Sequence, residues 1–530
     1  MLITMITLII SILFSLLSTV VIGYIALATP IGPWMEMTLV LLGTLFFNLI
    51  FSKVSQVHKV QALAFSTAAG GIAGAVAMAC AFSFPTLYFL DPNLFNAWMS
   101  NPFTFIALLA ALVIAAGSFG IAIGMWCQPS LLQNPDMVFP IGQMVYNMIA
   151  IQNQTKKALQ LAFGAASALF YCLVQAFTAL MPARLTLLPA YHIAAFDIPL
   201  VTTRTDMIPM FWAIGFTTGH VIAIPLLVAV ITRIFLVDPI HHFWFSDLSS
   251  TDYILAFGAG MAIQGALLGL IDIPKILKKS FKNLFTSTAS NQTASKKTKG
   301  YLLLILLSLV FLTYFSFSIP AQVYLLLCTA LCTYQLLVIA GRLGIAPLGR
   351  FATFVMVPGL ILFGFNAMQV TIVATFVEIA GVVAVDMMFG QKVAQLADLN
   401  KNKMLVYQWL GLLISAFAIG VIFLLLINHF GLGSAELIAS RAQSRAVLVH
   451  AFNFNYWVMI LGFIFSYSLK FIGVNPTLVF GGLLMGLDTS LMLIAGGLST
   501  YLVKDKEEHY PFWSGVYATN SLWIFIKMLF

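Results

Sequence analysis

A few ionisable side chains lie inside long apolar stretches, and they are the first candidates for chemistry. Glu378 stands in IVATFVEIAGVV, where uncharged residues flank it for more than a helical turn on each side. An acid within a membrane-spanning segment costs about 2.5 to 3.5 kcal/mol on insertion scales, so it is a functional candidate by default. Burial disfavours the charged form of a carboxyl group, which lets such a group take up and release a proton near neutral pH. Glu378 is therefore predicted to couple protons; the alternative is a structural acid bonded to a neighbouring helix.

Asp386 follows Glu378 by eight residues. On one helix the two side chains are rotated by about 80° from each other, so they could flank a common cavity. Asp386 could instead lie at a helix end and cap the turn at Gly390.

Asp488 and His220 occupy similar places in the two halves of the chain. Asp488 follows Gly482 and Gly486 in an apolar stretch, where small residues let a helix or a ligand approach closely. A polar group beside them could line a solute pathway, although a lone histidine more often serves packing. We predict that three acids couple protons: Glu378, Asp386 and Asp488.

Polar residues next to glycines are candidates for binding a solute. A Gly-Gln pair could mark a broken helix, which is tolerated at membrane depth only beside protein or water; it could equally begin an interfacial loop. Asn and Ser side chains could bind peptide carbonyls, but they also hold helices together. The substrate-binding candidates are Gly142, Gln143, Asn147, His220, Gly390, Gln391, Gly486, Ser514 and Asn520.

Neither a metal site nor a cofactor is predicted. The five cysteines show no CxxC or Cys/His spacing, so they are expected to be buried free thiols. His241 and His242 stand near two aspartates in a short polar stretch, where a solvated surface is the expected environment. The strings HExxH, GxSxG and GxxxxGK[ST] are absent, which argues against the corresponding enzymes and against ATP coupling.

The elements that carry these residues are predicted from composition. The 530 residues are 61% hydrophobic and 8% charged, with a mean hydropathy of +1.02. Soluble domains carry about a quarter charged residues, so water could not solvate this surface. Apolar stretches long enough to span a bilayer recur along the chain and predict an all-α polytopic membrane protein. We expect about 14 to 16 spanning helices, some of them short, Gly-broken and re-entrant.

The sequence leaves the number of membrane crossings in the first half undecided. The stretch from Leu2 to Ala28 lacks a basic n-region, so it is expected to be a retained helix and not a signal peptide. With a cytoplasmic N-terminus the first half must cross an even number of times, and seven stretches are clear. The eighth could lie in Leu185 to Val201 or in Phe139 to Ile151, and an external N-terminus would need neither.

Lysines divide the chain. Seven of them and no acid lie between Lys275 and Lys299, within a Ser/Thr/Asn-rich stretch. The positive-inside rule makes this a cytoplasmic linker. We therefore expect an N-terminal transmembrane half at 1–274, a linker at 275–300 and a C-terminal transmembrane half at 301–530. The net charge of +8 is scattered over loops, which argues against a nucleic-acid partner.

The two halves share three ordered sequence similarities, which predict an internal repeat. Each pair starts from glycines or a proline at similar spacing, although apolar helices also resemble one another by chance. The pairs are Gly142–Gly164 with Gly390–Gly411, PMFWAIGFTTGH with PTLVFGGLLMGLD, and FGAGMAIQGALLG with WSGVYATNSLWIF. Repeated halves with a pathway at their interface are a recurrent transporter design.

Five ordered strings carry a family resemblance: FPIGQMVYN, GFTTGHVIAIPLL, VAVDMMFGQKVAQLADLNKNKML, NPTLVFGGLLMGLD and SGVYATNSLW. Together they resemble the oligopeptide transporter superfamily, including its yellow stripe-like branch. The resemblance implies proton-driven import of short peptides or of metal bound to a peptide-like chelator. It matches an acid at Asp386, Met388 and a base at Lys392, whereas Gly390 and Gln391 depart from the family's usual Asp-Phe.

The expected function is secondary active import of a small polar solute by alternating access, coupled to protons through membrane-embedded acids. A non-enzymatic integral protein of a bacterial cytoplasmic membrane is expected, with solute, protons and lipid as partners, and it could form a homodimer. An intramembrane enzyme and a channel are the alternatives. Uptake that saturates and follows a proton gradient would distinguish a transporter from both.

Overall fold

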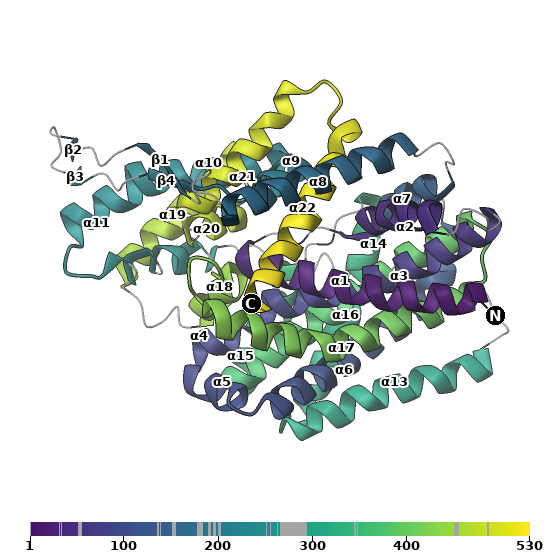
Figure 1. The fold of residues 1–530 in the computed structure, drawn as a ribbon. Helices are drawn as coiled ribbons and strands as arrows, with labels where there is room; N and C mark the ends of the chain where they lie inside the picture. The colour runs from purple at the N-terminus through teal and green to yellow at the C-terminus, as the bar shows by residue number, and fades with distance from the viewer. Residues whose placement is uncertain are drawn as a thin grey trace. The chain divides into compact units, whose positions relative to one another are not determined.

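The described part of the chain folds mainly into α-helices in a computed structural model (Figure 1). The chain forms two compact units, each built from separate stretches of sequence. Unit 1 comprises Met1–Ala26, Ile31–Asn153 and Ala266–Leu432; unit 2 comprises Leu27–Pro30, Gln154–Gly265 and Gly433–Phe530. The structure describes residues 2–30, 32, 34–50, 56–134, 137, 139–150, 155–177, 184–188, 192–193, 198–199, 203–250, 252–254, 256–261, 263–264, 294–343, 346, 348–449, 455–484 and 487–529.

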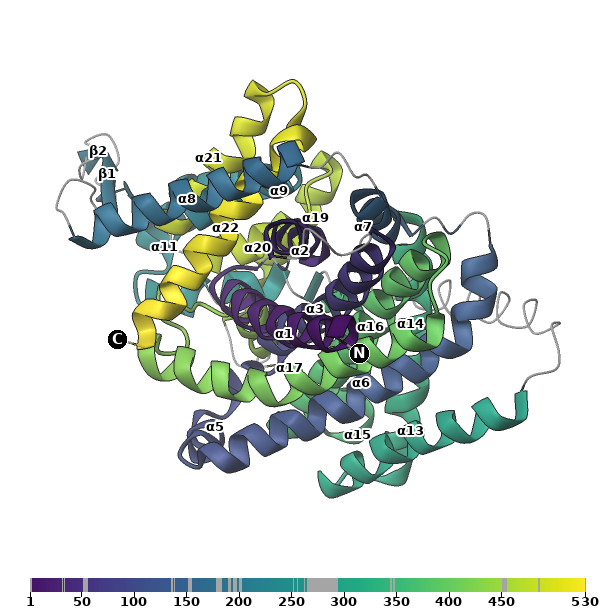
Figure 2. The same cartoon turned by 45° about the vertical axis from the view of Figure 1, so that its right-hand side comes forward.

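Unit 1 is a bundle of long apolar helices. Its helices are α1 (Leu2–Ala28), α2 (Glu36–Ile50), α3 (Gln56–Ser83), α4 (Thr86–Leu90), α5 (Pro92–Met99), α6 (Pro102–Gln133), α7 (Pro140–Ala150), α13 (Ala294–Tyr314), α14 (Ile319–Leu343), α15 (Leu348–Phe363), α16 (Ala367–Leu396) and α17 (Lys401–Phe430). Figures 1 and 2 show α6 and α17 running beside α16, and α3 packs against both α16 and α17.

Helices α3 and α16 form the core of unit 1, because the most apolar 18-residue window of each is completely buried. Glycines bring their neighbours very close. A Cβ atom on Gly120 of α6 would lie 2.3 Å from the backbone oxygen of Ala380, and one on Gly411 of α17 would lie 2.1 Å from that of Ala69. Backbones that approach so closely fix the positions of any polar side chains between them.

Helix α16 runs without a break through Gly390 and Gln391. A capping box begins it: the Asn366 side chain accepts a hydrogen bond from Gln369 N–H, and the Gln369 side chain accepts one from Asn366 N–H. The prediction that Gly390 and Gln391 mark a helix break or an interfacial loop is therefore wrong. Packing on all sides outweighs the weak helix preference of one glycine.

Unit 2 pairs helices from the two ends of the chain. Its helices are α8 (Thr155–Phe177), α9 (Pro209–Thr218), α10 (His220–Thr232), the π-helix η1 (Arg233–Val237), α11 (Asp238–Trp244), α18 (Ser440–Val449), α19 (Tyr456–Ile472), α20 (Pro476–Leu484), α21 (Leu487–Ser499), the 3₁₀-helix η3 (Thr500–Leu502) and α22 (Lys506–Leu529). Helix α8 packs on α22, α9 on α21, and α10 on both α20 and α21.

Glycines also make the closest crossings of unit 2. Gly164 of α8 lies against the Phe512 backbone, and Gly515 of α22 lies against that of Leu161. Gly215 of α9 and Gly496 of α21 make the same reciprocal contact. Each pair lets two helices touch along their backbones.

A helix break lies at Gly219, where the sequence analysis predicted none. This residue ends α9 and precedes α10, with a φ of 63° that glycine adopts without strain. The corresponding glycine of the second half, Gly486, lies outside the described residues, between α20 and α21.

Leu185 to Val201 does not provide the eighth crossing of the first half, as far as the structure describes it. Strand β1 (Arg184–Leu188) pairs antiparallel with β4 (Thr203–Asp206), and β2 (His192–Ile193) pairs with β3 (Ile198–Pro199). The other candidate, Phe139 to Ile151, contains α7, whose 11 residues are too few to span a bilayer.

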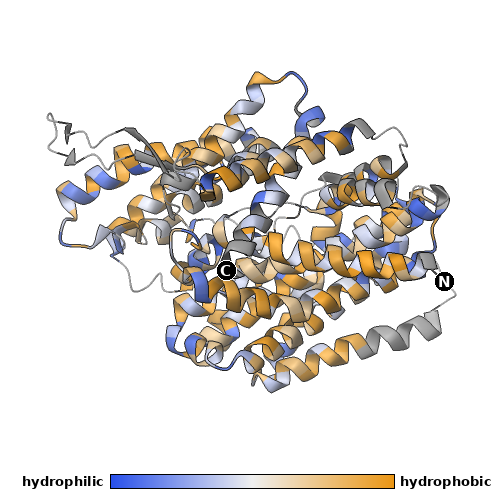
Figure 3. Ribbon diagram, in the orientation of Figure 1, coloured by the Kyte–Doolittle hydropathy of each residue, from blue (hydrophilic) through white to orange (hydrophobic). Residues whose placement is uncertain are grey.

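The chain is an integral membrane protein with apolar helices. Eight helices of the described residues are long and apolar enough to cross a membrane, and four shorter apolar helices accompany them. Figure 3 shows hydrophobic residues along the lengths of the long helices. The number of 14 to 16 spans, with some of them re-entrant, stays a prediction.

The two compact units do not follow the two predicted sequence halves, because each takes one stretch or more from either side of the lysine-rich region. Residues 265–293 of that region lie outside the described part. The last three of its lysines belong to the first two turns of α13, which begins within the predicted linker.

Replacing Gly120 with Ala is expected to lower the thermal stability of the purified protein in detergent, because the new methyl group meets the Ala380 backbone. Overpacking of this kind costs about 1–3 kcal/mol. Gly23→Ala is the matched control, since its nearest neighbour would be a side-chain atom at 3.5 Å. Equal melting temperatures for both variants would contradict the close crossing of α6 and α16.

Candidate functional site

A narrow pocket lies inside unit 1, among α2, α3, α7 and α16. It has room for about one water molecule. Two of its lining residues are acids, one is a threonine, and most of the others are small or apolar. The lining residues are Glu36, Ala64, Thr67, Ala68, Gly142, Val145, Asp386, Phe389, Gly390 and Val393.

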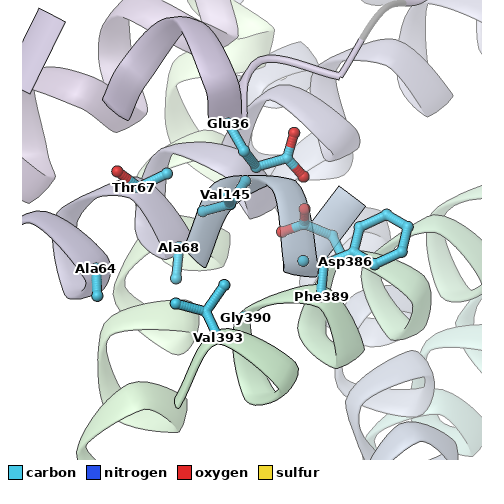
Figure 4. A pocket seen from close by; sticks show the side chains of 10 residues that line it. Glu36, Ala64, Thr67, Ala68, Val145, Asp386, Phe389, Gly390 and Val393 are labelled. Carbon is cyan, nitrogen blue, oxygen red and sulfur yellow. The ribbon is translucent and has the colours of Figure 1, made fainter. Parts of the chain in front are cut away.

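Glu36 and Asp386 meet in this pocket. Only 4% of Glu36 and 2% of Asp386 is exposed, and Figure 4 shows the two carboxyl groups turned toward each other. They lie within hydrogen-bonding reach of each other, a bond that needs a proton on one of them. None of their four oxygen atoms accepts a hydrogen bond from any other described group. The pair therefore has unused capacity for a proton or a cationic group.

Gly71 of α3 makes room for the pair. A Cβ atom there would lie 3.0 Å from both Asp386 carboxyl oxygens and from Glu36 Cγ. Any larger residue would press on both acids. Glu36 stands in the first turn of α2, where unpaired backbone N–H groups favour negative charge, whereas Asp386 stands mid-helix.

The lining residues that the structure describes include no basic side chain. Two ionised carboxylates without a counterion would carry a desolvation penalty of several kcal/mol each. At least one positive charge, from a proton or a bound cation, must therefore accompany the pair in the closed pocket.

Phe389 forms the aromatic wall of the pocket beside Asp386 (Figure 4). Its ring contacts Trp34 edge to face at 5.2 Å between centroids and Phe139 at 6.3 Å. Phe139 has a positive φ of 51°, and its N–H donates to the Gly341 carbonyl over 2.8 Å. The chain segments that lead into α2 and α7 are thus packed against Phe389.

Gly142 and Gly390 line the pocket as the smallest possible residues. A Cβ atom on Gly142 would lie 2.8 Å from the Phe389 carbonyl oxygen, and one on Gly390 would meet the Gln408 amide nitrogen at 2.4 Å. Both glycines therefore act by permitting close packing. The structure brings Asp386, Gly142 and Gly390 together, as three of the predicted site residues.

The Gln391 side chain forms hydrogen bonds with side chains of two neighbouring helices. Its side-chain oxygen accepts from Gln128 at 3.2 Å, and its amide donates to the Gln408 side chain at 3.2 Å. Gln408 in turn donates to the Met387 carbonyl at 3.0 Å. These bonds join α6, α16 and α17 behind the pocket.

Glu378 does not share the pocket with Asp386. It is completely buried, and its Oε2 accepts a hydrogen bond from Ser83 Oγ at 2.5 Å. Eight residues correspond to about 12 Å along the helix axis. Cys80 lies close to it on α3. The prediction that Glu378 and Asp386 flank a common cavity is therefore wrong for this pocket, which only Asp386 lines.

Gln143, another candidate of unit 1, is not among the described lining residues of this pocket. Gln143 is exposed on α7. Asn147 lies on the same helix, and its side chain is outside the described part of the structure.

Two candidates of unit 2 have described side chains. Asn520 is buried; its side-chain oxygen accepts from Met210 N–H at 3.1 Å, and its amide lies 3.1 Å from Cys172 Sγ. These bonds hold α22 to α8 and to the start of α9. His220 is exposed at the first residue of α10, with its ring 6.3 Å from that of Tyr501.

Asp488 and Ser514 have described backbones only. Asp488 lies in the first turn of α21, and Ser514 lies within α22. Their side chains, like the whole of Gly486, lie outside the described part of the structure. Their predicted roles stay predictions.

No group of three or more His, Cys, Asp or Glu side chains within the described residues could hold a metal ion. His241, considered for a metal, instead makes a 2.9 Å hydrogen bond through Nε2 to the Leu248 carbonyl. All five cysteines are free thiols.

Sequence reasoning missed Glu36. It stands one residue inside an apolar stretch that begins at Met35, so it looked like an interfacial end of that stretch. The signal that could have found it is its position ahead of 14 uncharged residues, which makes it a first-turn acid of an apolar helix.

No protein-family model and no curated protein sequence matches the chain. The resemblance to oligopeptide transporters therefore stays a prediction.

Replacing Glu378 with Gln is expected to leave the melting temperature of the purified protein nearly unchanged, because the amide oxygen still accepts from Ser83. Glu378→Leu leaves that hydroxyl without this acceptor, a loss of about 1–3 kcal/mol. Thermal unfolding followed by tryptophan fluorescence measures both. If the leucine variant were as stable as the glutamine variant, the hydrogen bond would contribute nothing.

Proposed function

We propose that the protein is a secondary active transporter that imports short peptides or peptide-like metal chelates by alternating access, driven by protons. One observation carries the proposal: the buried carboxyl groups of Glu36 and Asp386 face each other with no base in the described lining of their pocket, and Asp386 lies on a helix long enough to cross a membrane. Acids within membrane-spanning helices are mostly kept where they handle ions or protons. Paired carboxyl groups also serve as the acid and base of hydrolytic enzymes, the alternative that a transport assay distinguishes.

The chemistry of coupling follows from the cost of buried charge. When the pocket opens to the more acidic side, a carboxyl group takes up a proton, which lowers the penalty for closing the site. When it opens to the other side, water returns and the proton leaves. The pocket can therefore close only when the carboxyl pair has bound a proton.

The present conformation is closed around the pair, since the pocket holds about one water molecule. A peptide needs far more space, so alternating access requires lining elements to move. Helix α7 is short and contributes only Gly142 and Val145, which makes it the smallest element to displace.

The order of elements supports a duplicated architecture of the kind such transporters use. The order α1, α2, α3, α6 to α10 corresponds to α14 to α21. Helices α9 and α20 have 10 and 9 residues and both begin at proline, and each precedes a helix of 13 residues. In this alignment α7 corresponds to α18, so Gly142 and Gly390 are not equivalent, contrary to the first predicted pair.

Packing follows the same correspondence. In unit 1, α3 packs on α17 and α6 packs on α16, which are equivalent contacts if the halves are related by a twofold axis. In unit 2, Gly164 and Gly515 join α8 to α22. Gly260 and Gly462 make the corresponding contact between residues 256–261 and α19.

Replacing Asp386 with Asn is expected to abolish accumulation of a labelled test peptide, trialanine, in proteoliposomes with an inward proton gradient. The amide keeps the size of the side chain but cannot exchange a proton. Accumulation above the external concentration, with and without an uncoupler, is the measurement.

Asp398→Asn is the matched control, because Asp398 is exposed just beyond the same helix. That variant should accumulate trialanine like the unmodified protein. Proton-driven accumulation by the Asp386→Asn variant would remove the acid pair from the coupling mechanism. An absence of gradient-driven uptake by the unmodified protein, across di- to tetrapeptides, would refute peptide transport.

A further inference from the structure

Helix α18 of unit 2 begins inside the protein. Its first residue and the three residues before it are each 6% exposed or less: Leu437, Ile438, Ala439 and Ser440. Ala439 stands where a side-chain oxygen usually caps a helix, and its methyl group cannot do so. The first N–H that bonds within the helix is that of Gln443, which donates to the Ala439 carbonyl over 3.0 Å. The N–H groups of the three residues before Gln443 therefore have no acceptor within the helix.

A hydroxyl group at the same helix end is buried without a partner. Ser440 is 1% exposed, and its Oγ forms no hydrogen bond with any described group. Because the Cα–Cβ bonds of a helix tilt toward its N-terminus, the hydroxyl of this first residue lies at the end that carries the unbonded N–H groups. A serine inside a helix can satisfy its hydroxyl on the carbonyl four residues back, as Ser444 does on Ser440 over 2.7 Å. Ser440 thus adds a donor to the helix start.

Positive charge is concentrated on α18. Arg441 and Arg445 lie one turn apart, and Arg445 is only 5% exposed. The first turn of α18 contains no acid, and α20, which packs on α18, carries no charged residue. Glu436 is the one acid between positions 431 and 487 of the sequence, and it is exposed. Because the helix dipole is also positive at this end, the start of α18 favours an anion.

Backbone contacts within unit 2 hold this helix start in place. The Ala439 N–H donates to the Leu27 carbonyl over 2.7 Å, and Arg441 Nε donates to the Pro30 carbonyl over 2.7 Å. Ala439 adopts a φ of 48°, which turns the chain into α18. The donors of the first turn are therefore fixed before any ligand binds.

A carboxylate matches this set of donors. Its two oxygen atoms accept hydrogen bonds from hydroxyl, backbone N–H and guanidinium groups. We propose that the N-terminus of α18 binds a carboxylate group of the transported solute, with the Ser440 hydroxyl and the first-turn N–H groups as donors and Arg445 as the countercharge; this rests on the proposed transport function. The substrate class is therefore peptides or peptide-like chelates with a free carboxylate.

The architecture supports this location. In secondary transporters the N-terminus of a short, discontinuous helix commonly faces an anionic group of the substrate. Helix α18 has 10 residues, which are too few to span a bilayer. Its equivalent in the proposed alignment of the two halves is α7, which lines the acid pocket of unit 1. The proposal thus gives the two equivalent short helices related tasks, each within its own unit.

Acetate tests the site as the simplest carboxylate. The melting temperature of the purified full-length protein is measured over a concentration series of sodium acetate, with sodium chloride and with acetamide at the same concentrations. Acetate is expected to stabilise the protein more than chloride does, and acetamide should have no effect. Equal effects of acetate and chloride would show a response to salt alone and overturn the proposal.

Ser440→Ala separates binding from structure. Because the hydroxyl has no partner among the described groups, its removal should not lower the melting temperature measured without acetate. It should raise the half-maximal acetate concentration about tenfold. Ser444→Ala is the matched control on the same helix and should respond to acetate like the unmodified protein. An unaltered acetate response of Ser440→Ala would overturn the site.

Arg445→Gln tests the countercharge. It removes the positive charge and should raise the half-maximal acetate concentration by more than the serine variant does. A response like that of the unmodified protein would overturn the assignment of Arg445. If the glutamine variant does not fold, the comparison of Ser440→Ala with Ser444→Ala still decides the proposal.

Transport separates this inference from the general function. Proteoliposomes with a proton gradient should take up trialanine and reject trialaninamide, which lacks the carboxylate, by at least about tenfold. Equal proton-driven uptake of both peptides would overturn carboxylate recognition and leave proton-coupled transport intact. Uptake of neither would count against peptide transport itself, and the acetate series would then decide the site.

Discussion

The structure depends on two carboxyl groups that share a closed apolar space without a base. Every nearby feature accommodates this arrangement. Gly71 leaves room for both acids, the first turn of α2 supports Glu36, and an uninterrupted α16 carries Asp386. Because like charges repel strongly when they are desolvated, the proposed transport cycle requires a positive charge beside the pair whenever the pocket is closed.

The precision of the pocket comes from backbone contacts between helices. Glycines at the α3–α17 and α6–α16 crossings bring helices together with almost no intervening side chain. Behind the pocket, hydrogen bonds among Gln128, Gln391 and Gln408 fasten α16 to two of its neighbours. Such close backbone contacts leave these crossings little room to shift.

Composition and apolar spacing predicted the membrane class and most long helices, because each long helix must cover its own backbone polar groups in lipid. They also identified Asp386, whose rarity among apolar neighbours is a local signal. They failed where distant packing decides. Gly390 and Gln391 look like a break, yet α16 passes through them because neighbours surround it on all sides.

Glu36 shows the other limit of the sequence. Its importance comes from meeting Asp386, which is 350 positions away in the chain, and nothing around it reports that contact. The stretch after Leu185 shows the same limit, because its strand β1 pairs with β4, which lies beyond the stretch in the sequence.

The division of each unit between distant stretches has a consequence for biogenesis. Helix α3 leaves the ribosome more than 280 residues before α16, whose surface covers it in the finished protein. Until then its glycine-rich faces must be shielded by lipid, by the insertion machinery or by temporary neighbours. The final stretch after residue 432 likewise supplies the second helix of every glycine-linked pair in unit 2, so assembly of that unit waits for the end of translation.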